Sequence, residues 1–134
     1  MKSKLLSVAF SFIFIAGCAS MESMKTAPLE SGTEQIFDWP AEDILRFAND
    51  SLFASGLKII ESNQINENAW MILAEDGVFV RLVIQRLDIM RTSVRVYSKK
   101  KSFDESSGNY VGLIFSSIDF KIKMKLARNT YAHP

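Results

Sequence analysis

The sequence is poor in the residues on which many catalytic sites depend. Its 134 residues include one cysteine, Cys18, and one histidine, His133, which is the penultimate residue. One cysteine cannot form an internal disulfide, and a lone histidine at the end of a chain argues against Ser-His-Asp, Cys-His and zinc sites. The six glycines are scattered and form no phosphate-binding loop. Two carboxylate pairs, at 75–76 and 104–105, fall in predicted turns, so we expect no enzymatic activity, no metal and no cofactor.

A charge excess of one sign is also missing, since 16 basic residues face 15 acidic ones. Nucleic-acid-binding domains normally carry a strong basic excess, so this balance argues against that class. The charges are unevenly distributed: residues 30–76 contain ten acidic and two basic residues, whereas residues 77–134 contain eleven basic and four acidic ones. The two halves can pair across the fold, which we favour, or the second half can present a basic surface to an anionic lipid headgroup or glycan.

The N-terminal apolar run is too short for a transmembrane helix. Residues 5–15 carry no charge and follow Lys2 and Lys4, whereas a spanning helix needs about 20 apolar residues. A basic start, a short apolar run and small residues after it are typical of a secretory signal peptide. We therefore assign residues 1–17 to a signal peptide rather than to a buried first helix, which would lack a polar face.

The end of this run resembles the lipobox of bacterial lipoproteins. Ile15, Ala16, Gly17 and Cys18 match its aliphatic, small, Gly-or-Ala and Cys positions. The resemblance implies that Cys18 becomes the N-terminal residue, with diacylglycerol on its thiol and a fatty acid on its amine in a Gram-negative bacterium. Two or more acyl chains anchor a protein stably. Residue 19 is Ala rather than Asp, and in that family this choice favours export to the outer membrane.

Composition divides the remaining chain into one domain and its flanks. Residues 18–35 are rich in Ser, Thr, Glu, Gly and Pro and show no sustained periodicity. We read them as the lipidated cysteine and a flexible tether with a reach of roughly 20–25 Å. Residues 36–128 are predicted to form a single domain, and residues 129–134 a tail.

Apolar periodicity within the domain predicts a helix followed by strands. A stripe at three- and four-residue steps indicates a helix over about 40–55, with Pro40 in its first turn. Short connections between the strands favour an antiparallel meander with one buried and one polar face. Three or four strands are predicted, at 57–61, 69–75, 78–87 and 92–98.

The last element is ambiguous between helix and strand. An apolar stripe favours a helix over 109–122, whereas strict alternation with lysines over 119–126 is typical of a strand. We favour the helix, although Lys125 would fall within the apolar stripe of a longer helix. The predicted fold is thus a two-layer α+β domain in which two helices pack on one face of an antiparallel sheet of three or four strands. This layout, over 37–126, resembles small periplasmic lipoproteins that carry a domain of unknown function, and the resemblance implies a fold but no activity.

The polar face of the predicted sheet is the candidate interface. Arg81 and Arg95 alternate with apolar residues that face the core, and Tyr and Arg are common interface anchors. Exposed edge strands offer a second route, in which a peptide adds to the sheet. The lysine run that follows is either a solvated loop or part of the same surface. The candidate residues are Arg81, Arg95, Tyr97, Lys99, Lys100 and Lys101.

These observations favour a non-enzymatic outer-membrane lipoprotein, anchored to the membrane by lipid, that binds or helps assemble another envelope protein. The alternative is a binder of an anionic envelope ligand, a lipid headgroup or glycan, through the basic C-terminal half. A carboxylate hydrolase is a distant third hypothesis. Nucleic acid is not an expected partner, and the sequence leaves the oligomeric state open.

Overall fold

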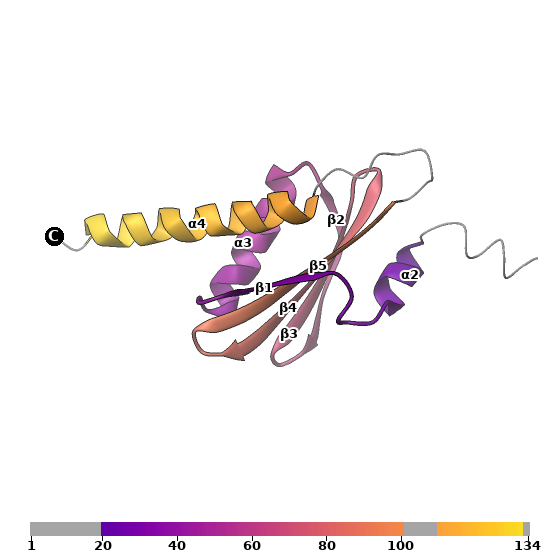
Figure 1. Cartoon of the computed structure of the whole chain (residues 1–134), viewed down its shortest axis with the longest axis horizontal. Coiled ribbons are helices and arrows are strands. Elements are labelled where there is room, and N and C mark those ends of the chain that lie inside the picture. The colour runs from indigo at the N-terminus through magenta and orange to yellow at the C-terminus, as the bar shows by residue number, and fades with distance from the viewer. Residues whose placement is uncertain (1–19, 101–109, 133–134) are drawn as a thin grey trace, which may run out of the picture.

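Five strands form one antiparallel sheet in the computed structural model, which describes residues 20–100 and 110–132 (Figure 1). In space the strands follow the order β1-β5-β4-β3-β2, so that β2 to β5 form a meander and β1 pairs with β5 at one edge. The strands are β1 (Thr33–Phe37), β2 (Lys58–Asn66), β3 (Ala69–Glu75), β4 (Val78–Asp88) and β5 (Arg91–Lys100). The predicted antiparallel meander is confirmed.

The predicted sheet of three or four strands with two helices is wrong, because the described residues form five strands and three helices. The additional strand, β1, and the additional helix, α2 (Met21–Thr26), both begin within residues 18–35, which were expected to be a flexible tether. Neither has a strong apolar signal. Only Phe37 of β1 is buried, and Met24 is the one buried residue of the six-residue α2.

Two helices cover one face of the sheet, as predicted (Figure 1). The helix predicted over 40–55 is α3 (Ala41–Ala54), which Pro40 precedes and in which Ile44, Ala48 and Leu52 are fully buried. Its N-terminus carries Glu42 and Asp43 in the first turn, where carboxylates favour the positive end of the helix dipole.

The C-terminal helix, α4 (Tyr110–Ala132), confirms the helix predicted over 109–122, and the alternative strand over 119–126 is wrong. The helix also continues into residues 129–132, which were expected to form a tail. Lys125, the residue that argued against a long helix, lies beside α3. Its ammonium is 3.1 Å from the Asp43 carboxylate and 6.0 Å from the centroid of the Phe47 ring.

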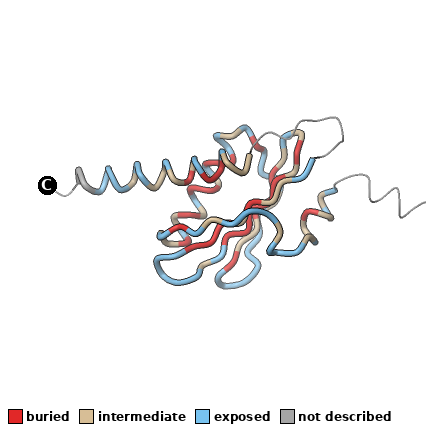
Figure 2. The backbone as a smooth tube through the Cα atoms, viewed as in Figure 1, coloured by how far each residue is buried: buried red, intermediate tan, exposed pale blue. Residues whose placement is uncertain are grey.

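The hydrophobic core lies between the sheet and these two helices (Figure 2). Alternate residues of β4 point into it, as the sequence predicted, while α4 contributes a buried stripe. We call this side of the sheet the inner face. Its fully buried side chains include Val80, Leu82, Ile84, Val94, Ile114 and Ile118.

The opposite side, the outer face, is covered at one end by α2 (Figure 1). Met24 of α2 is completely buried, although the residues around it in the sequence are polar. The helix begins with a capping box, in which Ser20 and Ser23 each accept a hydrogen bond from the other's backbone N–H. A short helix of this size is not stable alone, so its contacts with the sheet must hold it.

Candidate functional site on the outer face

Arg81 occupies the centre of the outer face. It is directly opposite Leu73 of β3 and Tyr97 of β5 in the sheet register. Its side chain was expected to be exposed, but its accessible surface is 0% of the fully exposed value. A buried arginine requires partners for its donors, since an unpaired buried charge is strongly unfavourable.

The partners of Arg81 are backbone carbonyls at the C-terminal end of α2. Nη1 donates hydrogen bonds of 2.8 Å to the carbonyls of Met24 and Ala27, and Nη2 donates one of 2.7 Å to that of Pro28. The last carbonyls of a helix lack intrahelical donors and form the negative end of its dipole. The guanidinium therefore caps α2 and binds it to the sheet at the same time.

Tyr97 lies on the other side of this guanidinium. The Arg81 Cζ is 5.4 Å from the centroid of the Tyr97 ring, within cation–π distance. Burial lowers the pKa of the Arg81 guanidinium from its ordinary value, and the electrostatic effect of Tyr97 opposes this shift. An arginine remains protonated in proteins, so the charge stays available to the α2 carbonyls.

Arg95 holds the loop that follows α2. Its Nη1 donates a hydrogen bond of 2.8 Å to the Glu30 carbonyl, and its Nη2 lies 3.2 Å from the Glu34 carboxylate. The Ser93 hydroxyl donates to the same carboxylate oxygen at 2.6 Å. At the end of this loop Gly32 has a φ of +97°, and a Cβ there would lie 2.3 Å from the Val96 carbonyl oxygen.

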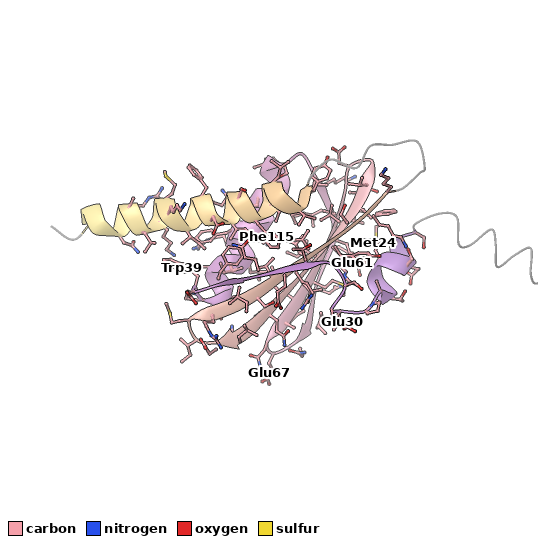
Figure 3. The ribbon with its side chains drawn as sticks, viewed as in Figure 1. Met24, Glu30, Trp39, Glu61, Glu67 and Phe115 are labelled. Carbon is pink, nitrogen blue, oxygen red and sulfur yellow. The ribbon has the colours of Figure 1, made fainter. Side chains whose placement is uncertain are left out.

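A third contact joins α2 to the edge strand β2. The Lys25 ammonium is 2.7 Å from the Glu61 carboxylate. The hydrogen bond between them raises the pKa of Lys25, and the same bond, with a second from the Asn63 amide, lowers the pKa of Glu61. In Figure 3, Met24, Glu30 and Glu61 lie together at the end of the sheet that α2 covers.

We call residues 20–31 the strap. The sequence correctly placed Arg81, Arg95 and Tyr97 together on one face, but as a surface for another protein. Instead, Arg81 and Arg95 bind the strap, which is part of the same chain. Arg81 is inaccessible, so the predicted docking patch built on it is wrong.

The remaining candidates do not join this cluster. Lys99 and Lys100 are exposed at the end of β5, opposite Phe79 and Val78 in the register. Cys18 and Lys101 lie outside the described residues. The signals that sequence reasoning passed over are modest: an isolated methionine, Met24, and two serines at capping spacing.

Chemically reactive arrangements are scarce in the part of the chain that the structure describes. No group of three or more His, Cys, Asp or Glu side chains there could hold a metal ion. The Asp76 carboxylate accepts a hydrogen bond of 2.8 Å from the Tyr110 hydroxyl, and this bond raises the pKa of that phenol. Asp76 therefore joins the β3–β4 turn to α4. The pair at 104–105 lies outside the described residues.

Several cations of the second half pair with carboxylates of the first. Arg86 binds Glu42, and Arg95 and Lys125 bind Glu34 and Asp43. These three bridges agree with the interpretation that the acidic and basic halves pair across the fold.

No helix among residues 20–100 and 110–132 has both the length and the apolar character needed to cross a membrane. In comparisons with known proteins, the chain matches no protein-family model and is not significantly similar to any curated protein.

Proposed function

We propose that the protein is a non-enzymatic, lipid-anchored outer-membrane protein whose domain is held directly at the membrane and there binds another envelope protein. The observation that carries this proposal is the attachment of the strap to the sheet by Arg81. The lipobox resemblance places the lipid on Cys18, and Ser20 is already the N-cap of α2.

The strap changes how an anchored domain would sit. Only Ala19 separates Cys18 from the capping residue, so a chain of this length spans at most roughly 7 Å. A flexible tether over 18–35 would instead reach roughly 20–25 Å. We infer that the lipid limits the distance of the domain from the bilayer and restricts its orientation, which suits a protein that positions a binding surface relative to the bilayer.

A binding role is favoured over catalysis because polar groups of the outer face pair with other groups of the same chain. Arg81 and Arg95 of the outer face are engaged with the chain's own carbonyls and carboxylates, and the core on the other side of the sheet is apolar. The cross-fold ion pairs likewise reduce the basic character available to an anionic small ligand.

Cell fractionation of a Cys18→Ala variant tests the anchor. The wild-type chain should be found in the outer-membrane fraction, and the variant should be soluble in the periplasm. A variant that stays in the membrane fraction would show that the anchor lies elsewhere. An Arg81→Met variant is the matched control, since it disturbs the strap but keeps the lipid and should remain in the membrane.

A further inference from the structure

The C-terminal half of α4 extends beyond the sheet (Figure 1). Its side chains form a groove with those of α3. The groove has a volume of about 480 Å³. Phe47, Phe120 and Met124 supply its apolar lining, and Lys121 and Arg128 are among its basic residues. Phe120 is 62% exposed and Met124 is 50% exposed, so two large apolar side chains of the groove face solvent.

The lining of this groove carries four cations and one carboxylate, that of Asp50, so its charges do not balance. Arg46 and Lys125 share one carboxylate, that of Asp43, at 2.8 Å and 3.1 Å. Among the described residues, Lys121 and Arg128 have no carboxylate at ion-pair distance. The groove therefore combines exposed apolar side chains with cations that lack a partner, unlike Arg81 and Arg95 of the outer face, which both have partners.

We propose that this groove binds an acidic segment of another envelope protein. A large apolar side chain of that segment would sit against Phe120 and Met124, and its carboxylates would pair with Lys121 and Arg128. The proposal rests on the proposed function and deepens it, because it names the binding surface and the chemistry of the partner. Complementary charge of this kind speeds association and selects against basic partners.

The position of the groove favours a protein over the membrane. Along the long axis of the molecule, the C-terminal half of α4 and the helix α2 lie at opposite ends (Figure 1). A lipid on Cys18, next to α2, would place the groove at the end away from the bilayer. A symmetric dimer through this groove is disfavoured because it would bring the same unpaired cations together.

Site-specific photo-crosslinking in living cells tests this surface. We would place p-benzoylphenylalanine at Met124 and, as a matched control, at Met90 in the β4–β5 turn, since these methionines are 50% and 51% exposed. The expected result is a discrete protein adduct from position 124 alone. Mass spectrometry should locate it in a segment that has net negative charge and a large apolar residue.

Charge-exchange variants decide whether the cations carry the binding. Lys121→Glu with Arg128→Glu should reduce the yield of the adduct at least tenfold, whereas Lys121→Arg with Arg128→Lys should retain it. Equal melting temperatures for the two variants would show that the fold is unchanged. An adduct that survives charge reversal, one with lipid alone, one with a second copy of this chain, or no adduct from position 124 would overturn the proposal.

Failure of the groove and failure of the proposed function give different results. Protein adducts from Met90 or from the exposed edge residue Ile60, without one from Met124, would reject the groove and keep a protein-binding role. The absence of protein adducts from all three positions would reject that role itself. The fractionation of the Cys18→Ala variant reports on the anchor separately.

Discussion

The two faces of the sheet are covered by different kinds of interaction. On the inner face, α3 and α4 bury a continuous apolar cluster. On the outer face, a six-residue helix is held mainly by one buried arginine, with a single methionine beneath it. Apolar contacts are numerous and non-directional, whereas the contacts of Arg81 are few and depend on the exact position of three carbonyls. The outer face should therefore open independently of the inner one.

The largest expected loss of stability comes from a substitution on the inner face. Leu82→Ala removes a fully buried side chain from the centre of β4, and the cavity and lost burial should lower the free energy of unfolding by about 2–5 kcal/mol. Urea denaturation would measure this. Leu87→Ala, on the same strand but exposed, is the control and should change it by less than about 0.5 kcal/mol. Similar losses from the two leucines would contradict the assigned core.

The second-largest expected loss of stability is at Gly32, which joins the strap to β1. Gly32 and Gly56 both have positive φ, but only at Gly32 does an added Cβ meet backbone, the Val96 carbonyl. Gly56→Ala should cost about 1 kcal/mol of backbone strain. Gly32→Ala should cost about 1–3 kcal/mol more, because β1 and β5 must separate to admit the methyl group. Thermal unfolding of both variants measures the difference, and equal costs would show that the close approach of Gly32 to β5 is not tight.

Removal of the Arg81 guanidinium should loosen the outer face and leave the inner face unchanged. Arg81→Met keeps an apolar side chain but removes three charge-assisted hydrogen bonds, so docking of the strap should weaken by about 1.5–3 kcal/mol. Amide hydrogen exchange should accelerate in residues 20–31 and stay slow in β4 and α4. Arg91→Met, which removes an exposed arginine, should leave the strap protected. Exchange that accelerates throughout the sheet would mean that the faces are not independent.

The smallest effect is the pH dependence of the Lys25–Glu61 pair. The pKa of Glu61 in the folded state is below its ordinary 4.5, so the pair stabilises the strap above that pH and is lost as the pH falls through the folded value. The pKa of Lys25 is above its ordinary 10.5, so the same contribution is lost as the pH rises through the raised value. Because both side chains are partly exposed, salt should weaken the pair.

A spin label at Glu22 would report this change as increased mobility at both pH extremes. Glu61→Gln should remove the acidic response and leave label mobility at neutral pH only slightly raised. An acidic response that persists in this variant would assign the effect to another carboxylate.

Periodicity predicted the elements that bury a regular stripe. The spacing of Ile44, Ala48 and Leu52 in α3 and the alternation of Val80, Leu82 and Ile84 in β4 reflect burial on one side only, which is the condition under which such patterns arise. Both helices of the inner face and the four strands of the meander were predictable for this reason.

The strap and β1 were not predictable in the same way. Their residues are mostly polar, and their stability depends on side chains more than fifty positions away. Alternation correctly placed Arg81 on the outer face, but it cannot show what covers that face. Alternation therefore predicted which residues cluster on the outer face but not that the strap is their partner. The groove beside α4 was not predictable either, because it depends on how far α4 extends past the sheet.

The most direct test of the account is a distance measurement between the strap and the sheet. A Cys18→Ala background leaves no native cysteine, so spin labels can be attached at Glu22 in α2 and at Glu67 in the β2–β3 turn. Pulsed electron paramagnetic resonance should give one narrow distance distribution, which broadens when Arg81→Met is added. A distribution that is already broad with Arg81 present would contradict a strap fixed to the outer face and would restore a flexible tether.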